Sequence, residues 1–372
     1  MATQITNYQC PACTGPLQFS AQTGKMACEY CGSAFDVAEI EALYKDKEQK
    51  AAENMAEAEA KSETVSEGEW DASGLEEGWG AEADSMRAYN CPSCGAELIC
   101  DEHTAATACP YCGNPTVVPG KFTGTLKPDY VLPFKLDKKS AINALKKHYK
   151  GKIFLPGTFT QQQTVEKIQG IYVPFWLYDG IASGDFTFHA TRVHRHTRGN
   201  QEITETSHYN VYRSGSVAFE KVPVDASSKM PDDYMDSIEP YDYKELKPFS
   251  SAYLPGFLAD KFDVSVEDSN KRADTRFTGT LESEMTKSVT GYSSCVAVSR
   301  SVRLKRGKVR YAMLPVWLLN VKWNNKTYLF AVNGQSGRTA GNLPVSGGKV
   351  LAFFAAVAAP LSALAAILAM MM

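Results

Sequence analysis

The sequence lacks the local signatures of the commonest catalytic sites. It contains no G-x-x-x-x-G-K-[ST] phosphate loop, no G-x-S-x-G nucleophile turn and no H-E-x-x-H metal-binding pair. Nucleotide-driven chemistry and the commonest hydrolase mechanisms therefore have no support, and we expect a protein that is not an enzyme. An enzyme housed in the larger part of the chain would need a pocket with perturbed acids or histidines, which a sequence does not display.

Cysteine is almost absent from the last two thirds of the chain, where Cys295 stands alone. Eight of the ten cysteines instead form four C-x-x-C pairs within the first 112 residues. Paired knuckles of this kind are typical of metal sites rather than of a disulfide framework, and thiolate–zinc sites require a reducing compartment. No basic stretch followed by an apolar run opens the sequence, so we expect no secretory signal.

The four pairs fall into two sets, each with fourteen residues between its knuckles, which is near the spacing of zinc ribbons. Four thiolates around a tetrahedral zinc leave no open coordination position, so the metal folds its ribbon instead of activating water. A redox role of the C-x-x-C pairs is the competing interpretation. The predicted ligands of two zinc ions are Cys10, Cys13, Cys28 and Cys31 in the first ribbon and Cys91, Cys94, Cys109 and Cys112 in the second.

The two ribbons are similar enough to be copies of one module. Residues 8–32 align without a gap on residues 89–113, and the cysteines, a leucine, a tyrosine and the final glycine coincide. The glycines that follow the knuckles occupy positions where a positive φ is often required. We expect Cys100 and Cys295, which belong to no knuckle, to serve as small apolar side chains.

Arginine is absent from residues 36–86, where sixteen acidic residues and four lysines give a net charge of −12 and leave +9 on the remainder. The composition of residues 36–61 favours a helix, and that of residues 62–86 favours a disordered linker. Trp70 and Trp79 lie in this linker, where they either dock onto a partner or pack loosely on the neighbouring ribbon. A basic body favours anionic partners such as lipid headgroups or nucleic acid.

The larger part of the chain has the pattern of a strand-rich α+β body. Asp137 can cap a helix whose apolar face contains Ile142, Leu145 and Tyr149, and several strand-like runs follow. The segments that begin at residues 173 and 314 resemble each other, which suggests an internal repeat. We expect an α+β multidomain protein with a first zinc ribbon at 1–35, an acidic helical and disordered linker at 36–88, a second ribbon at 89–120, the α+β body at 121–345 and a transmembrane helix at 350–372.

The membrane helix is predicted from 23 residues, Val350–Met372, that contain no charge. A helix of this length spans roughly 35 Å, whereas the hydrocarbon core of a bilayer is about 30 Å thick. A buried core helix is the alternative interpretation. The sequence therefore predicts a single-pass, tail-anchored protein, and Lys349 beside the helix favours a body on the cytoplasmic side.

Two further clusters are candidates for binding. His189, His194, His196 and His208 lie in a predicted hairpin, where a metal site competes with the simpler interpretation of exposed cross-strand side chains. Residues 299–310 contain six cations interspersed with apolar and small residues. This basic run suits a strand face against anionic headgroups or nucleic acid, and a solvated strand face is the simpler alternative.

Several segments together resemble a known bacterial family. They are the two ribbons, the acidic linker, the stretches FEKVPVD (219–225), SIEP (237–240), YLPGFLADKFDV (253–264) and VNGQSG (332–337), and the apolar C-terminal helix. The combination resembles bacterial proteins labelled "TFIIB-type zinc ribbon-containing protein", over nearly the whole chain. The resemblance implies a protein of the bacterial plasma membrane that acts beside SPFH-domain (flotillin/stomatin-like) or phage-shock-protein-A-like membrane-stress proteins, and it supplies no catalytic residue.

From these features we expect a membrane-anchored zinc-ribbon adaptor that docks an SPFH-domain or phage-shock-protein-A-like partner at the cytoplasmic face of the membrane. Anionic lipid is a further expected contact. A nucleic-acid-binding or transcription-associated protein is the alternative, because zinc ribbons also serve as nucleic-acid modules.

Overall fold

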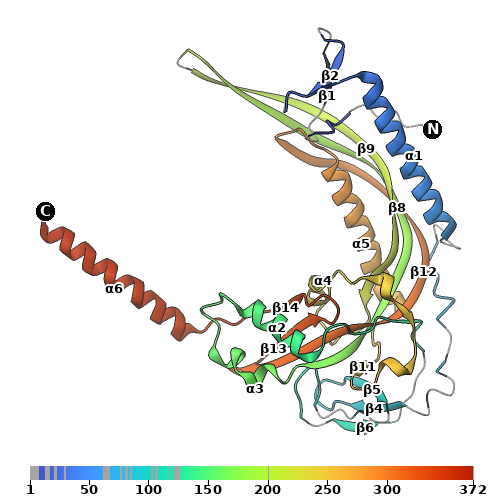
Figure 1. Ribbon diagram of the computed structural model, residues 1–372, viewed down its shortest axis with the longest axis vertical. Coiled ribbons are helices and arrows are strands. Elements are labelled where there is room, and N and C mark those ends of the chain that lie inside the picture. Colours follow the sequence, from blue (N-terminus) through green and yellow to red (C-terminus); the bar gives the residue numbers. More distant parts are fainter. Residues whose placement is uncertain are drawn as a thin grey trace. The chain divides into compact units, whose positions relative to one another are not determined.

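The computed structural model of the chain (Figure 1) describes residues 8–12, 17–20, 23–28, 31–61, 68–75, 78–79, 83, 86–101, 104, 108–115, 117–120, 126–199 and 201–371. The chain divides into two compact units, each built from three separate stretches of sequence. The first unit comprises residues 1–72, 178–222 and 270–309, and the second comprises residues 73–177, 223–269 and 310–372. Four long elements contribute residues to both units: β8 (Gln169–Arg198), β9 (Gln201–Asp225), α5 (Val266–Lys287) and β12 (Ser294–Trp323).

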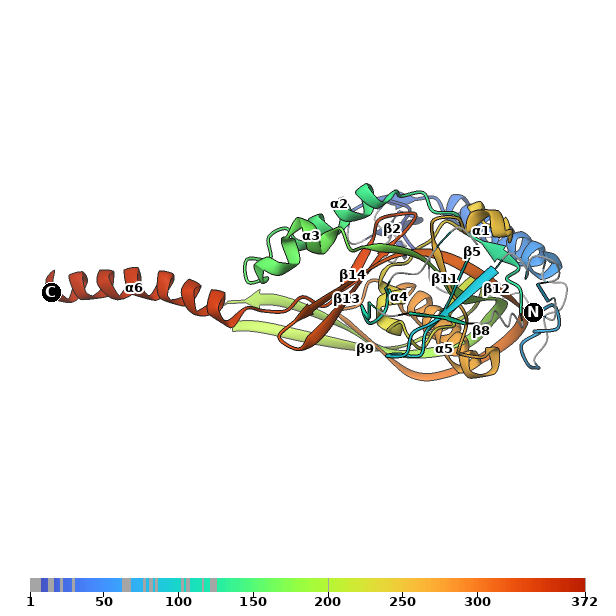
Figure 2. The same ribbon diagram turned by 90° about the horizontal axis from the view of Figure 1, so that it is seen from below.

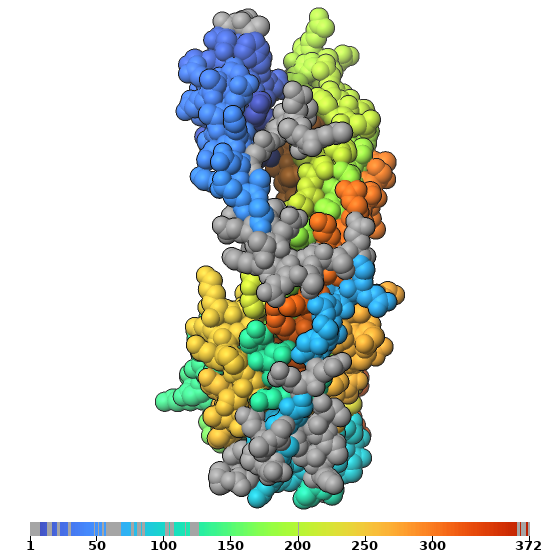
Figure 3. All heavy atoms as spheres, turned by 90° about the vertical axis from the view of Figure 1, so that its right-hand side faces the viewer, coloured from blue at the N-terminus to red at the C-terminus, as the bar shows by residue number. Residues whose placement is uncertain are grey.

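The first cysteine module opens the first unit as a small sheet with its own core. Its antiparallel strands are β1 (Leu17–Ser20), β2 (Lys25–Cys28) and β3 (Ala34–Phe35). The helix α1 (Val37–Lys61) follows and contributes Ile40 to the core, which also contains Cys10, Leu17, Met26 and Cys28. Most described side chains of α1 are exposed, and Figure 3 shows the helix, in blue, at the surface.

The rest of the first unit consists of the long strands β8, β9 and β12 with α5 packed against them (Figure 1). Glycines allow β8 and β12 to approach closely. A Cβ atom added to Gly180 would lie 2.7 Å from the Lys305 carbonyl oxygen, and one added to Gly307 would lie 2.6 Å from that of Asp179. On α5, Phe277 and Leu281 are fully buried, and the ring of Phe277 contacts that of Phe219 on β9.

The acidic segment after α1 is attached to this unit through Trp70. Its ring is 7% exposed and makes edge-to-face contacts with Tyr178 and Phe277. The indole Nε1 donates a hydrogen bond to Asp274 Oδ1 at 3.2 Å. Trp79, in the second unit, is equally buried and donates to the Leu126 carbonyl oxygen at 2.9 Å. Both tryptophans therefore fill the chain's own core rather than an exposed docking site.

The second unit is built around a mixed sheet in which eleven strands take part, some of them shared with the first unit. The order along its main path is β10-β7-β12-β8-β11-β5-β4-β6, while β13 pairs with β12 and β14, and β9 pairs with β8. The strands not yet named are β4 (Met86–Asn90), β5 (Glu97–Asp101), β6 (Val118–Gly120), β7 (Tyr130–Val131), β10 (Lys247–Pro248), β11 (Leu258–Asp260), β13 (Lys326–Asn333) and β14 (Thr339–Gly341).

The helices that belong wholly to this unit range from single turns to the 25-residue α6. The α-helices are α2 (Lys138–Tyr149), α3 (Gln162–Val165), α4 (Asp232–Ser237) and α6 (Gly347–Met371), and the 3-10 helices are η2 (Gly157–Thr160), η3 (Tyr243–Glu245) and η4 (Ser251–Tyr253). The predicted cap of α2 is confirmed, because Asp137 Oδ1 accepts from the Ser140 backbone N–H at 2.8 Å. Its predicted apolar face is also confirmed, since Ile142, Leu145 and Tyr149 are buried.

Two arrangements in the second unit repeat each other. β7 runs parallel to β12, and β11 runs parallel to β8. Just before α2, the Leu136 carbonyl oxygen accepts from Trp317 Nε1; just before α5, that of Val264 accepts from Trp176 Nε1. Trp176 and Trp317 hold the same place in the segments that begin at residues 173 and 314, so the sequence resemblance has a counterpart in the hydrogen bonds.

The C-terminal residues form α6, which Figure 2 shows as one uninterrupted helix that continues through Pro360. Its first turn is held by Lys349, whose Nζ donates to the Leu155 carbonyl oxygen. Among the residues that the structure describes, no helix is both long and apolar enough to cross a membrane. The prediction of a C-terminal transmembrane helix rested on the length of the uncharged run at 350–372, and it is wrong.

Three further predictions depended on that helix: the fold class, the tail anchor and the location at the plasma membrane. The observed fold class is strand-rich with a large mixed sheet, so the expected α+β multidomain class ending in a membrane helix is wrong. The description of the chain as a tail-anchored membrane protein is wrong for the same reason. The assignment to the bacterial plasma membrane by a single-pass anchor is also not supported by any helix of the described residues.

Replacement of Trp70 by alanine should destabilise the first unit. Removal of a large buried aromatic ring typically costs about 3–5 kcal/mol, and here the substitution also leaves Asp274 without one of its hydrogen bonds. Thermal and urea denaturation of the full chain should show an earlier transition. Phe19→Ala is the control, because that ring is 61% exposed; equal midpoints for the Trp70 and Phe19 variants would contradict the buried role of Trp70.

Candidate metal centres

The four cysteines of the second module converge on one point. The sulfur atoms of Cys91, Cys94, Cys109 and Cys112 all lie within 4.8 Å of one another. The Sγ–Sγ distances from Cys91 to Cys112 and from Cys94 to Cys109 are both 3.6 Å. A tetrahedron with Zn–S bonds of about 2.3 Å has an edge of about 3.8 Å, so the set has the dimensions of a tetrahedral metal site.

The same backbone hydrogen bond recurs at three of the knuckles. In each, a glycine N–H donates at 2.9 Å to the carbonyl oxygen of a cysteine: Gly32 to Cys28, Gly95 to Cys91 and Gly113 to Cys109. The φ angles of these glycines are 71°, 73° and 67°, which confirms the predicted positive φ. Residues with a Cβ adopt this region rarely, so glycine lets two sulfur atoms face one ion.

The first module brings together three of its predicted ligands. The sulfur atoms of Cys10, Cys28 and Cys31 lie within 4.8 Å of one another, and that of Cys10 is 3.6 Å from that of Cys31. Cys13, the fourth predicted ligand, lies outside the described residues. Cys10 and Cys28 are buried, whereas Cys31 is exposed and contacts Ser33 Oγ at 3.2 Å. Both cysteine sets can hold a metal ion.

The pKa values of the thiols in the second set indicate how a bound cation would stabilise the site. Burial raises the pKa of the Cys94 and Cys109 thiols. Burial also opposes ionisation of Cys91, but hydrogen bonds from the backbone of Cys94 and Ser93 outweigh it and lower the pKa of Cys91 to about 7. The thiolate is the form that ligates a metal. A bound cation would therefore stabilise the negative charge that burial disfavours.

The second module is part of the large sheet, whereas the first has a sheet of its own. β5 pairs with β4 along one edge and with β11 along the other, where Ala259 lies opposite Ile99. In the first module the equivalent strand β1 has Tyr8 on one side and β2 on the other. Because a strand has only two edges, β11 takes the place in the second module that β2 has in the first.

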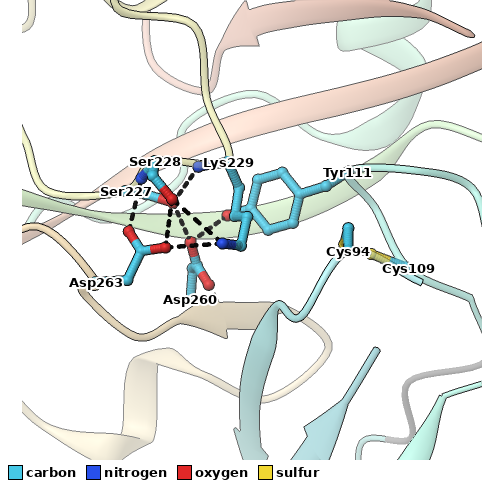
Figure 4. Close-up of polar contacts among 8 residues, drawn as sticks. All are labelled: Cys94, Cys109, Tyr111, Ser227, Ser228, Lys229, Asp260 and Asp263. Carbon is cyan, nitrogen blue, oxygen red and sulfur yellow. Dashed lines mark hydrogen bonds and ion pairs between the residues drawn. The ribbon is translucent and has the colours of Figure 1, made fainter. Parts of the chain in front are cut away.

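A buried polar network lies behind the second cysteine set (Figure 4). Tyr111, which lies between two of the cysteines, donates from its hydroxyl to Asp260 Oδ2 at 2.6 Å. Ser227 Oγ donates to the same oxygen, also at 2.6 Å. Asp260 is 1% exposed, and burial raises the pKa of its carboxyl to about 7 despite these two hydrogen bonds. The network therefore ties the metal-binding loop to β11 and to the segment after β9.

A second polar group, partly exposed, lies beside this network (Figure 4). Lys229 Nζ lies 2.9 Å from Asp263 Oδ2 and 3.2 Å from Ser228 Oγ. A lysine activates a neighbouring serine only when the amine is neutral. The hydrogen bond to Asp263 raises the pKa of Lys229, so its amine stays charged. This group orients the turn at residues 227–229 and offers no activated nucleophile.

Sequence reasoning did not identify Asp260 or Ser227 as parts of a site. Tyr111 gave a signal, because it repeats at the same place in both modules, and Asp260 lies in the segment 253–264 that carries the family resemblance. Neither signal indicated that the two side chains meet, since they are 149 residues apart in the chain.

The histidines form two pairs rather than one cluster. His189 Nε2 lies 3.2 Å from His208 Nδ1, and the rings of His194 and His196 are 5.8 Å apart. Alternate residues of a strand point to opposite faces, so the position of His189 on β8 separates it from the other pair. Within the described parts of the chain, the cysteine sets are the only groups of three or more His, Cys, Asp or Glu side chains placed to share an ion.

The basic run at residues 299–310 lies on β12, and much of its charge is paired within the first unit. Arg300 pairs with Glu282, and Arg303 lies 3.4 Å from Asp185. Arg306 donates from Nε and Nη2 to the two carboxylate oxygens of Asp274, at 3.0 and 2.8 Å.

The two cysteines outside the knuckles differ in burial. Cys100 is buried as expected, and its thiol donates to the Thr104 carbonyl oxygen, whereas Cys295 is half-buried.

The chain is 32% identical over 354 residues to the Bacillus subtilis (strain 168) protein described as "Uncharacterized protein YdjG". The aligned residues cover 95% of this chain and 94% of YdjG. The chain belongs to the YdjG family. No family model matches the chain. No solved structure matches it either. With 95% of the chain aligned, the similarity covers most of both units.

Replacement of Cys109 by serine should remove the metal ion of the second set. Serine lacks the thiolate that ligates the ion, and its hydroxyl would be buried, because Cys109 is 1% exposed. The metal content of the purified full chain, measured by mass spectrometry, should fall by about one equivalent, and the thermal midpoint should fall with it because the metal contributes folding free energy. Cys295→Ser is the control. An unchanged metal content in the Cys109 variant would show that the second set binds no ion.

Asp260 should make the stability of the second unit depend on pH. Its pKa is about 7 in the folded chain and about 3.9 in an unfolded one, so folding binds the proton more tightly. The contribution to the free energy of unfolding is therefore full below about pH 4 and decreases as pH rises to about 7, by on the order of 3 kcal/mol.

The isosteric variant Asp260→Asn should lose this dependence, because its amide oxygen can still accept from Tyr111 and Ser227. Urea denaturation of the metal-loaded wild type and variant between pH 5.5 and 8 (a range that brackets the raised pKa) measures the difference directly. A difference in stability between the two proteins that does not change with pH would contradict the raised pKa.

Proposed function

We propose that this chain is a non-enzymatic zinc-ribbon adaptor whose two cysteine modules have different roles. Both sets bind zinc in this proposal. The second zinc stabilises a module that belongs to the large sheet, and the first module presents a surface to a protein partner. The proposal is supported chiefly by the four-thiolate geometry of the second set, because a tetrahedral ion held by four sulfur atoms has no position for a substrate or a water molecule.

Zinc is the ion that fits these ligands best. Thiolate ligands favour zinc, copper(I) and iron–sulfur clusters, and a tetrahedral set of four is common for structural zinc. The knuckle turns, with a glycine of positive φ after the cysteine, hold the sulfur atoms before the ion arrives. Such preorganisation suits an ion that stays bound and supports the fold.

A comparison of the two modules supports docking by the first one. Phe19 on β1 is 61% exposed, whereas Cys100 at the equivalent position of the second module is fully buried. The same strand position is therefore covered by the large sheet in one module and open to solvent in the other. Aromatic side chains are enriched at protein–protein interfaces, so Phe19 is a candidate contact for the partner.

The family resemblance suggests what the partner is. In this proposal it is an SPFH-domain or phage-shock-protein-A-like protein. A nucleic acid is the alternative partner, but the pairing of Arg300, Arg303 and Arg306 with acidic side chains reduces the charge that the basic run offers to phosphates.

Affinity capture of the tagged full chain from cell extract, followed by mass spectrometry, tests the proposal. The wild type should recover an SPFH-domain or phage-shock-protein-A-like protein. Phe19→Ser should reduce the recovery roughly tenfold or more, as loss of an interface anchor does, without a change in thermal midpoint or metal content. The control variant Cys295→Ser should behave as the wild type.

Two outcomes would contradict the adaptor function. One is recovery of the same partner by the Phe19 variant and by a Cys28→Ser, Cys31→Ser double variant. The other is recovery of nucleic acid whose binding falls steeply with salt concentration, which would favour the alternative.

A further inference from the structure

A groove borders the second metal centre within the second unit. Its volume is about 570 Å³, which lies in the range of known ligand sites. One wall is the loop that carries Cys109, and the other walls come from the segment after α3 and from the end of β12. Asn320 on β12 donates from its side-chain amide to the Pro110 carbonyl oxygen and so fixes the distance between two of these walls.

The groove has a cationic rim. Lys138 of α2, Lys167 after α3 and Lys322 of β12 line it, and no ion pair of these lysines occurs among the described residues. The single acidic side chain in the lining is Glu166, which accepts a hydrogen bond from Gln162 Nε2 at 2.6 Å. The lysine and glutamate side chains of the lining thus carry three positive charges against one negative charge.

The rest of the lining is mixed. Pro110, Ile168 and Val321 supply apolar side chains, and two threonines and two side-chain amides supply polar ones. An occupant therefore needs apolar groups for the floor and negative charge for the rim. The described lining contains no aromatic side chain on which a nucleic-acid base could stack, which disfavours single-stranded nucleic acid. An extended peptide meets these requirements, because its alternate side chains point in opposite directions.

We propose that this groove binds an acidic, partly apolar peptide segment of the protein partner. The inference rests on the proposed adaptor function and adds a second contact to it, beside the first module. Glutamate or aspartate side chains of the peptide pair with the three lysines, and leucine-like side chains cover the apolar floor.

Fluorescence anisotropy with the zinc-loaded full chain tests the groove without knowledge of the partner. The probe is a short fluorescein-labelled peptide in which glutamate alternates with leucine, and a second peptide carries glutamine in place of glutamate. The glutamate peptide should bind and the glutamine peptide should not. In the variant Lys138→Ser, Lys167→Ser, Lys322→Ser, the affinity should fall roughly tenfold, as expected when three partly exposed ion pairs are lost.

The matched control is Lys139→Ser, Lys147→Ser, Lys150→Ser, which removes the same charge from exposed positions in or next to α2 that do not line the groove. It should retain the affinity of the wild type. A photo-crosslinking version of the peptide should label residues 108–115, 164–169 or 318–322. Equal losses in the two triple variants, or crosslinks only elsewhere, would overturn the proposal.

The metal content of the groove variant distinguishes peptide binding by the lysines from a role in the metal centre. Four thiolates and a divalent ion carry a formal charge of −2, so neutralisation of the metal centre is the alternative role of the lysines. If the groove variant loses its zinc while the control variant keeps it, the lysines neutralise the centre and the peptide site is refuted. If the groove variant keeps both its zinc and its peptide affinity while Phe19→Ser still loses the captured partner, the groove proposal fails and the adaptor function stands.

Discussion

The pairing of β5 with β11 is the constraint on which the second unit depends. It places a metal-binding module inside a large sheet, so the cysteine set stabilises the sheet as well as its own loops. The hydroxyl of Tyr111 reaches the buried Asp260 on β11 only because this pairing brings the two segments together. Burial of a carboxyl among hydrogen-bond donors is costly unless every contact is made, so the network favours one arrangement of module and sheet.

The two modules show how one local structure takes two roles. Their knuckles share the same turn, the same glycine conformation and similar sulfur distances. They differ at the edge of the central strand, where the first module uses its own β2 and the second uses β11 from far along the chain. As a result Phe19 is open to solvent while Cys100, its equivalent, is buried. A change at one strand edge thus leaves one module with a sheet of its own and builds the other into the large sheet.

The fold, and not the composition alone, decides which charged side chains are paired and which converge on one site. The run of cations at 299–310 looks available for anions in the sequence, yet three of its arginines pair with acidic side chains of the same unit. Lys138, Lys167 and Lys322 are far apart in the sequence and form no conspicuous run, yet they line one groove. A positive potential in a concave site arises from convergence of side chains, which a charge count along the chain does not reveal.

The sequence by itself determined the features that depend on neighbouring residues. The knuckle spacing predicted which cysteines meet, with Cys13 outside the described residues, and the glycines and Asp137 predicted the turns and the cap of α2. These succeed because a turn or a cap is set by a few consecutive residues.

The uncharged run at 350–372 misled, because absence of charge does not by itself make a helix that crosses a bilayer. Only the tertiary structure decided that β11 joins β5, that Trp70 fills the core of the first unit and that Asp260 meets Tyr111. Each of these contacts joins segments more than a hundred residues apart, and local pattern carries no information about which distant strand edge or side chain will fill a given place.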